Sequence, residues 1–511
     1  MLAIQRKLTR SFFVLLSLPA TAMGFALSVQ ISALSWILGT RYHLEIDEIG
    51  LVWAAGPIAG ILGQVIVGII SDNVWFWNGR RRPFILIGGV LASLMLLALP
   101  GIDVISTAMG IDGILGVAIA VALTLDLAIN VSFNPTRSVI ADVTPEGVNR
   151  TKGYTWMQTI SGTFGVLAYG VGAVWDNYVL IYTGVVLVFL FSVIPPFFIR
   201  EPRSLGWDDE DDVVGPMDPY ERPLPEDIQN KLEVPASGGE PFTLIDILKA
   251  IEPLWGFLVY AVYGMTRRLA GFDLGHYYVE YACAALTLVL IGKALVASDA
   301  GKSKDEAGLI GFKKVLAAHS FSWIAVQSMF IYMFPYVQQK LPALSEVDAG
   351  RVVSWSFLVL NAVGAVLPAF VLEPITEKIG RVKTHTGCLA VMTLGYAGLL
   401  FFGFSPAVIY GLMVVTGVGW GAIVSLPFAI MSQTISQAKM GLFMGLFNLS
   451  VVLPQLVASL GVGEAVNRAA DKNVLFIICT VTMAFSAAAW LLVKEGGRDA
   501  RGAAPPAGGG H

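Results

Sequence analysis

Residues 125–142 read LDLAINVSFNPTRSVIAD and place an acid and a base inside a long apolar run. Asp126 and Arg137 carry opposite charges, and Asn130 and Phe133 lie between them. A charge at the centre of a bilayer costs about 2.5–3.5 kcal/mol on insertion scales. We therefore expect both charged residues to have a functional or structural role. A helix turns about 100° per residue, which brings the four side chains onto one face, along a stripe about 16 Å long.

This stripe suits a ligand rich in hydroxyl groups. Carboxylate, amide and guanidinium groups supply hydrogen-bond acceptors and donors, and an aromatic ring covers C–H faces. Intramembrane charges usually face a cavity or each other. Asp126 and Arg137 lie three turns apart and cannot touch directly, which disfavours a purely structural ion pair. We therefore expect the stripe to line a central cavity.

The composition indicates a polytopic membrane protein. The chain has 511 residues, of which 55% are hydrophobic and 14% charged, whereas soluble domains average about 25% charged residues. A span needs about 20 apolar residues, so the length allows roughly a dozen spans. The apolar runs lie near 11–39, 49–70, 83–100, 113–141, 153–175, 178–198, 252–266, 278–297, 315–337, 352–372, 386–404, 406–432, 441–461 and 474–493.

The centre of the chain interrupts this pattern. Two apolar stretches within 252–297 must return to the side on which they begin, either as a two-span hairpin, giving 14 spans, or as interfacial helices, giving 12. We favour the hairpin. The predicted organisation is a six-helix bundle over 1–199, an acidic and Pro-rich linker over 200–250, the inserted hydrophobic pair over 251–300, a second six-helix bundle over 301–495 and a disordered tail over 496–511.

Most Lys and Arg residues fall on the side of the N-terminus when the spans alternate. This bias predicts that both termini are cytoplasmic. The three cysteines, Cys283, Cys388 and Cys479, lie in apolar runs at spacings that match no metal site or disulfide framework, and we interpret them as packed thiols.

Two loops at corresponding places in the halves resemble each other. GIISDNVWFWNGRRRP (68–83) and EPITEKIGR (373–381) each combine an acid, a short loop and a Gly-Arg pair. Such repeated halves are typical of transporters that rock between two states. We expect these loops, with Asp142 at the end of the Asp126 helix, to anchor or gate the halves. The candidate gating residues are Gly68, Asp72, Arg80, Arg81, Arg82, Asp142, Glu373, Glu377 and Arg381.

The first loop resembles the motif of the major facilitator superfamily, with a longer gap between Asp72 and Gly79. Three further stretches, GRRRPFILIGG, LDLAINVSFNPTRSVIAD and MGLFNLSVVLPQLVASL, are similar to the sucrose/proton symporters of plants and their animal and bacterial relatives, a group like the glycoside-pentoside-hexuronide:cation symporters. The resemblance implies an all-α fold of two six-helix halves around a central cavity. The inserted pair departs from the plant pattern.

The resemblance also implies a function and roles for the stripe. We expect a symporter in the plasma (inner) membrane that imports a disaccharide or glucoside, sucrose or maltose foremost, together with a proton. Asp126 would carry the proton and Arg137 would bind the substrate. The expected partners are sugar, proton and lipid, with no nucleic acid, no obligate protein partner, no metal and no cofactor.

Further polar side chains inside apolar runs are candidate substrate ligands beside Asn130 and Phe133. Each amide is about as able to bond a neighbouring helix as a substrate. Asn448 and Gln455, seven residues apart, share one helix face. The candidates are Gln30, Gln158, Gln327, Asn361, Asn448 and Gln455. We interpret Trp323 as packing and His319 as a histidine at the cytoplasmic edge.

Alternative functions remain open at this point. A sodium-coupled sugar carrier or an organic-ion or drug exporter would share the fold. A non-transporting sensor or scaffold would need a soluble signalling domain, for which the linker and tail are too short. The sequence contains neither a zinc-protease HExxH motif nor a nucleophile elbow, so we do not expect an enzyme.

Overall fold

The computed structural model describes residues 5, 7–60, 75–111, 113–144, 148–201, 244–271, 274, 276–431 and 440–494. Within these ranges the secondary structure is helical apart from one isolated bridge between Phe76 and Gly79. Ten of the described helices are long and apolar enough to cross a membrane. The predicted all-α polytopic fold is confirmed.

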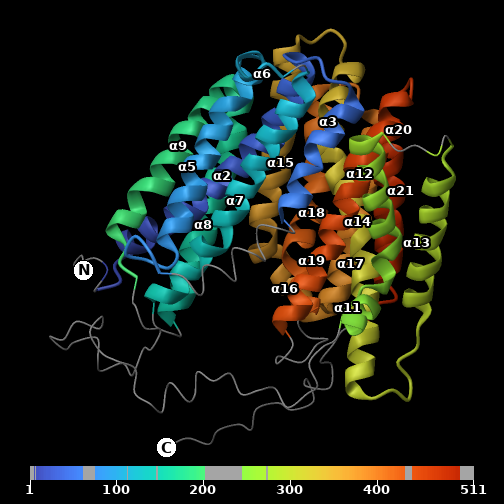
Figure 1. Ribbon diagram of the computed structural model, residues 1–511. Helices are drawn as coiled ribbons and strands as arrows, with labels where there is room; N and C mark the ends of the chain where they lie inside the picture. Colours follow the sequence, from blue (N-terminus) through green and yellow to red (C-terminus); the bar gives the residue numbers. More distant parts are fainter. Residues whose placement is uncertain are drawn as a thin grey trace, which may run out of the picture.

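The first half of the molecule is drawn in blue to green (Figure 1). Pro135 lies inside the helix that carries Asp126, and this helix continues past it. The elements are α2 (Arg10–Thr40), α3 (Ile46–Trp53), α5 (Arg82–Ala98), η1 (Leu99–Gly101), α6 (Ile102–Met109), α7 (Ile114–Val143), α8 (Val148–Val174) and α9 (Asn177–Phe198).

The second half is drawn in yellow to red beside the first (Figure 1). Its elements are α14 (Lys304–Lys340), α15 (Glu346–Leu367), η4 (Pro368–Leu372), α16 (Glu373–Ile379), α17 (Arg381–Phe402), α18 (Pro406–Met431), α19 (Met440–Val457), η6 (Ala458–Val462), α20 (Gly463–Arg468) and α21 (Val474–Trp490). Both η4 and η6 are π-helices, which break the regular ladder of hydrogen bonds. The Tyr332 hydroxyl donates to the carbonyls of Ala458 and Ser459 in η6 at 3.1 and 3.0 Å.

The inserted segment forms an antiparallel pair of helices, α12 (Trp255–Ala270) and α13 (Tyr278–Val296). The short helices α11 (Leu244–Ala250) and η3 (Glu252–Leu254) precede it, so the last residues of the predicted linker are helical. α12 packs on α19 and α13 packs on α14, with α13 at the outer edge of the bundle (Figure 1). Of the two, α13 is long and apolar enough to cross a membrane, whereas α12 is not among the helices that meet this criterion. That the pair spans the membrane twice stays a prediction, and we call α12 and α13 the inserted hairpin.

The bundle has two ends that the rest of the description uses. At the α3 end, α2 ends and α3 begins, and α20 lies beside α3 (Figure 1). At the N-terminal end, Gln5 Nε2 donates to the carbonyl of Arg200, just after α9, at 2.8 Å. The inserted segment is fixed at two levels of the bundle: Glu252 of η3, just before the hairpin, binds Lys313 of α14, and Arg268 of α12 binds Asp47 in α3.

Side-chain caps explain where several helices begin. Thr9 and Asp176 accept hydrogen bonds from the first turns of α2 and α9. Ser303 and Glu306 form a capping box at the start of α14, in which each side chain accepts from the other residue's backbone N–H. Such caps satisfy amide groups that a helix leaves unpaired at its N-terminus.

Candidate functional site

Asp126 lies in the interior of α7. It follows Ile114 by about 18 Å and precedes Val143 by about 26 Å along the helix axis, at 1.5 Å per residue. Its side chain is buried, and Gln30 Nε2 of α2 donates to its Oδ2 at 3.0 Å. Among the described residues, this carboxyl forms no ion pair. Within the part of the chain that the structure describes, the site therefore combines a buried acid with an amide partner and no ion pair.

Gly56 lies beside the Asp126 carboxyl and leaves a small space next to it. A methyl group on Gly56 would lie 3.3 Å from Asp126 Oδ2 and 3.4 Å from Oδ1. Any larger side chain at this position would therefore press on the acid. Only the packing of the helices places Gly56 against Asp126, which lies 70 residues further along the chain.

The remaining residues of the α7 stripe divide into local contacts. Asn130 Nδ2 donates to the backbone carbonyl of Asp126 at 2.8 Å, one turn back on the same helix. The Arg137 guanidinium lies over the Phe133 ring, 4.4 Å from its centroid. The predicted stripe therefore has two levels. Asp126 and Asn130 lie at one level, and Arg137 lies over Phe133 about two turns further along α7.

The second half contributes a pair of amides. Gln455 Nε2 of α19 donates to Gln327 Oε1 of α14 at 3.2 Å. Gln327 is buried and Gln455 is half-buried. Two amides joined in this way leave further donors and acceptors for a ligand, because each amide group can make several hydrogen bonds.

An aromatic cluster lies next to these amides in the second half. Trp420 Nε1 of α18 donates to Asn361 Oδ1 of α15 at 3.1 Å. The Trp420 ring packs edge-on against Trp323 and Phe330 of α14, with centroids 6.2 and 5.4 Å apart. Trp323 Nε1 in turn donates to His319 Nε2 at 2.8 Å, which fixes its ring.

Sequence reasoning missed Trp420, because TGVGWGA is typical of close helix packing, and it interpreted Trp323 as packing alone. His319 is buried rather than at an edge. The described hydrogen bonds therefore bring together Gln30 with Asp126 and Gln327 with Gln455. Gln158, exposed on α8, and Asn448, half-buried on α19, take part in neither pair.

The candidate gating residues of the first half meet at the N-terminal end. Arg81 Nε binds Asp142 Oδ2 at 3.1 Å, and the two side chains are only 8% and 9% exposed. The sequence had suggested a cap or gate contact for Asp142, and its partner is this arginine. Both residues belong to the first half, so the ion pair joins the start of α5 to the end of α7.

Glu201 completes this arrangement and was not anticipated from the sequence. Its Oε2 accepts from the backbone N–H groups of Arg80 and Arg81, and its Oε1 from that of Arg82, each at 2.7 Å. A carboxylate is well placed at a helix N-terminus, where the unpaired amides lie. Burial raises the pKa of Glu201, and the three amide hydrogen bonds oppose this shift. A methyl group on Gly79 would lie 2.7 Å from Glu201 Oε1, which explains a glycine before the arginines.

The other predicted loop residues are less informative. Gly68 and Asp72, and the side chain of Glu373, lie outside the described residues. Glu377 is exposed at the end of α16 and Arg381 is half-buried at the start of α17. Among the described residues, no group of three or more His, Cys, Asp or Glu side chains could hold a metal ion. The three cysteines are buried and unpaired.

The two halves meet directly at the α3 end. Ser32 Oγ of α2 lies 2.7 Å from Ser354 Oγ of α15, and both are buried. Trp36 Nε1 donates to the carbonyl of Glu346 at 3.0 Å. Arg351 Nε donates to the carbonyl of Trp175 at the end of α8 at 2.6 Å. These bonds close the α3 end of the interface between the halves.

Known proteins resemble this chain in sequence. It is 30% identical over 176 residues to the general alpha-glucoside permease of Schizosaccharomyces pombe (32% of this chain, 31% of that protein). It is 32% identical over 178 residues to the sucrose transport protein SUC4 of Arabidopsis thaliana (31% and 33%). These matches span about a third of each relative. The sucrose transport protein SUT2 of Oryza sativa subsp. indica is 24% identical over 532 residues (90% and 86%).

Solved structures share the fold at low sequence identity. The inward-open xylose transporter XylE from E. coli has a TM-score of 0.55 at 15% identity, covering 95% of this chain and 96% of that one. The nucleoside transporter NupG has a TM-score of 0.56 at 10% identity, covering 94% and 99%. The family model of the Major Facilitator Superfamily matches residues 16–459. The chain, a membrane protein with many transmembrane helices, therefore belongs to the Major Facilitator Superfamily.

Proposed function

We propose that the protein is a symporter that imports a disaccharide or glucoside together with a proton. The observation that carries the proposal is the buried Asp126 carboxyl, which has an amide partner in Gln30 and no ion pair among the described residues. Carrying an ionised carboxylate through a closed state is costly, whereas a protonated one has no charge to bury. Resemblance to sucrose and alpha-glucoside transporters supports the substrate class.

The substrate would bind between the two halves. Asp126, Gln30 and Arg137 would bind its hydroxyl groups from the first half, with Asn130 beside them. Gln327, Gln455 and Asn361 would do so from the second half, with Asn448 and Gln158 as further candidates. The rings of Phe133, Trp323 and Trp420 would cover the apolar faces of the sugar.

Transport would proceed by alternating access. The bias of Lys and Arg supports a cytoplasmic N-terminal end in a protein of the plasma membrane. The α3 end then faces outside, and the contacts of Ser32 and Trp36 with the second half correspond to a carrier closed to the outside. Opening this end would expose Asp126 to external protons. Proton and sugar would then favour each other's binding by reciprocal linkage, and the loaded carrier would reclose and release both inside.

Proton coupling can be tested with purified protein in liposomes that contain a pH-sensitive dye. Sucrose, maltose and glucose are added outside in turn, for the native protein, Asp126→Asn and the control Asp103→Asn. Asp103 is also a carboxylate of the first half, but it forms a surface ion pair with Arg41. We expect one sugar to acidify the interior, and only Asp126→Asn to abolish the signal.

Two other outcomes would change the proposal. Uptake of radiolabelled sugar without acidification, but dependent on sodium, would replace the proton with sodium as the coupling ion. No uptake of any of the three sugars by correctly inserted protein would contradict the sugar assignment. Proton release driven by organic cations would instead support an exporter.

A further inference from the structure

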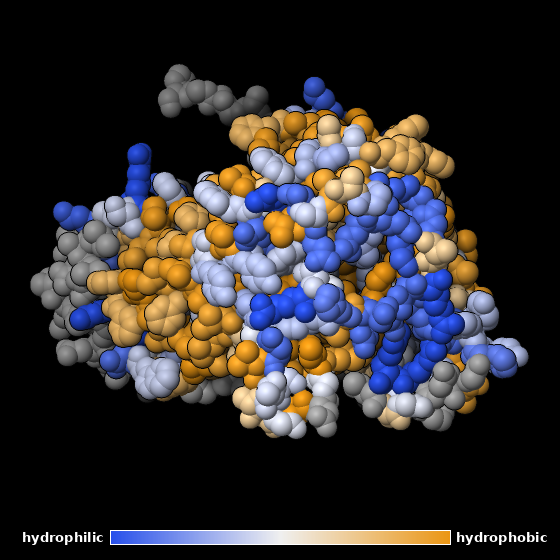
Figure 2. All heavy atoms as spheres, turned by 90° about the horizontal axis from the view of Figure 1, so that it is seen from above, coloured by the Kyte–Doolittle hydropathy of each residue, from blue (hydrophilic) through white to orange (hydrophobic). Residues whose placement is uncertain are grey.

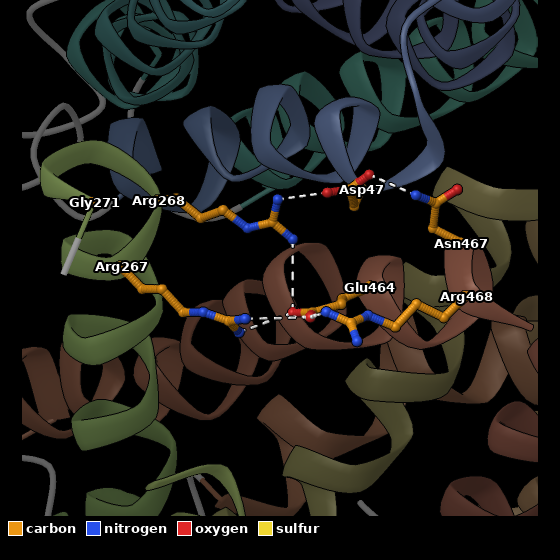
Figure 3. A pocket seen from close by; sticks show the side chains of 7 residues that line it. All are labelled: Asp47, Arg267, Arg268, Gly271, Glu464, Asn467 and Arg468. Carbon is orange, nitrogen blue, oxygen red and sulfur yellow. Dashed lines mark hydrogen bonds and ion pairs between the residues drawn. The ribbon is translucent and has the colours of Figure 1, made fainter. Parts of the chain in front are cut away.

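A pocket of about 470 Å³ opens at the α3 end where three parts of the chain converge (Figure 3). Seen from this end, hydrophilic side chains gather on the right of the face, over the second half and the inserted hairpin (Figure 2). The residues lining the pocket carry both signs of charge and come from all three parts. They are Asp47, Arg267, Arg268, Gly271, Glu464, Asn467 and Arg468.

Arg268 of the hairpin contacts both halves at once. Its Nη1 binds Asp47 Oδ2 in the first turn of α3, which belongs to the first half. Its Nη2 lies 3.7 Å from Glu464 Oε2 in α20, which belongs to the second half. Asp47 also accepts a hydrogen bond from Asn467 Nδ2 of the second half at 2.8 Å. A guanidinium can make both contacts because its planar fork presents several donors.

Glu464 is held in place by the hairpin and by its own helix. Arg267 Nη1 lies 3.0 Å from Glu464 Oε2, and the Tyr277 hydroxyl donates to Oε1 at 3.0 Å. Arg468, one turn further along α20, binds Oε1 at 2.7 Å. The side chains of Asp47, Arg268 and Glu464 are 20%, 21% and 13% exposed. Partial burial makes such charges less screened by salt than a surface pair.

Next to these charged residues, α3, η6 and α12 pack closely at two glycines, Gly50 and Gly461. A methyl group on Gly50 of α3 would lie 2.2 Å from the carbonyl oxygen of Ser459 in η6. A methyl group on Gly461 would lie 2.6 Å from the Tyr260 hydroxyl of α12. The backbones of α3 and η6 therefore lie in close contact, and the Tyr260 side chain of the hairpin packs on η6 at Gly461. Any opening of this end must separate α3 from η6 and α20.

We propose that the inserted hairpin is a third component of the gate at the α3 end, with Arg268 as the residue through which the hairpin contacts both halves. The inference rests on the proposed function only in that a transporter must open this end in its cycle. The hairpin is packed against the second half through α14 and α19. Opening would therefore carry Arg268 away from Asp47 and break the charged contact between them.

A simpler role would be to attach the hairpin to the second half. Arg267 suffices for that role, because it binds Glu464 and also Glu280 of the hairpin itself at 3.1 Å. Arg268 differs in reaching Asp47, which is 221 residues away in sequence and lies on the opposite side of the interface. The two roles predict different effects when Arg268 is replaced.

The test uses a cysteine as a reporter of opening. Ser354 is fully buried between the halves at the α3 end, so Ser354→Cys reacts with a membrane-impermeant maleimide only when this end opens. Labelling is measured on protein in liposomes, without sugar or a proton gradient, and the protein without the reporter gives the background. Arg268→Gln and, on the other side of the contact, Asp47→Asn are expected to raise the labelling rate about three- to fivefold.

The matched control is Arg41→Gln. Arg41 pairs with Asp103 at 3.3 Å near the same end, but both residues belong to the first half. Equal labelling of Arg268→Gln and the parent, or an equal rise in Arg41→Gln, would overturn the proposal. Exchanging the charges with Asp47→Arg and Arg268→Asp should bring the rate back toward that of the parent. Because no substrate is used, a wrong assignment of sugar or proton leaves this result unaffected.

Discussion

The two ends of the molecule use charged side chains differently. At the N-terminal end, Arg81, Asp142 and Glu201 are buried and bind one another's helices within the first half. At the α3 end, Arg268 and Asp47 are partly exposed and connect segments from different parts of the chain. The first arrangement stabilises one half, whereas the second links segments of both halves and the inserted hairpin, which our proposal requires to separate.

This difference indicates which contacts are able to change during a transport cycle. A buried pair that loses one partner leaves an uncompensated charge, at a cost of about 3–5 kcal/mol. A partly exposed pair can be replaced by water at a cost of about 1 kcal/mol or less. Contacts that break and reform in each cycle are therefore expected to be of the second kind, and rigid elements to contain the first.

The largest effect is expected from Gly50→Ala at the α3 end. The added methyl would lie 2.2 Å from a backbone carbonyl of the second half, so this end could not close as it does here. We expect Ser354→Cys labelling to approach that of an open protein, and transport of the substrate to fall more than about tenfold, since such overpacking costs about 1–3 kcal/mol or more.

The control for this prediction is Gly411→Ala in α18. Both glycines are helical, so alanine improves helix propensity equally, but a methyl on Gly411 meets nothing within 4 Å. A normal labelling rate in Gly50→Ala would show that α3 moves away from η6 without opening the interface, and the distinction between the ends would fail.

The next effect is expected from Arg81→Met at the N-terminal end. It leaves Asp142 buried without this partner and should lower the free energy of unfolding by about 3–5 kcal/mol. Thermal unfolding in detergent, followed by tryptophan fluorescence, measures the loss. The exposed pair of Arg41 and Asp103 offers a comparison, since Arg41→Met should cost less than about 1 kcal/mol.

Labelling of Ser354→Cys should stay at the parent rate in Arg81→Met, because the lost contact joins α5 and α7 of one half. An increased rate would mean that the two ends are coupled through the first half. The separation between stabilising and gating charges would then have to be abandoned.

The smallest effect concerns the base of the inserted hairpin. Hydrogen bonds from Lys293 and Lys313, at 2.6 and 2.8 Å, lower the pKa of Glu252. A lowered pKa in the folded state contributes stability above the ordinary pKa of glutamate, and this stability is lost as pH falls through the lowered value. We expect a contribution below about 1 kcal/mol, because the side chains are partly exposed.

Unfolding measured from neutral to acidic pH checks this prediction. Glu252→Gln should lower stability at neutral pH and reduce its loss at acidic pH, whereas Glu377→Gln, on exposed α16, should follow the native protein. If the pH dependence of Glu252→Gln matches that of the native protein, Glu252 does not contribute through its charge.

Much of the fold could be predicted from local patterns. The apolar runs at 113–141 and 278–297 correspond closely to α7 (Ile114–Val143) and α13 (Tyr278–Val296), because a membrane helix needs a continuous apolar segment of defined length. The helical period predicted that Phe133 and Arg137 share one face, and the Arg137 guanidinium does lie over the Phe133 ring.

The sequence by itself therefore determined the helices, their apolar length and which side chains share a helix face. Only the tertiary structure decided which faces meet: Gln30 with Asp126, Gln327 with Gln455, and Arg268 with Asp47. The reason is physical. Helix formation and apolar length depend on neighbouring residues, whereas these contacts join residues that lie 96 to 221 positions apart and form only when whole helices pack.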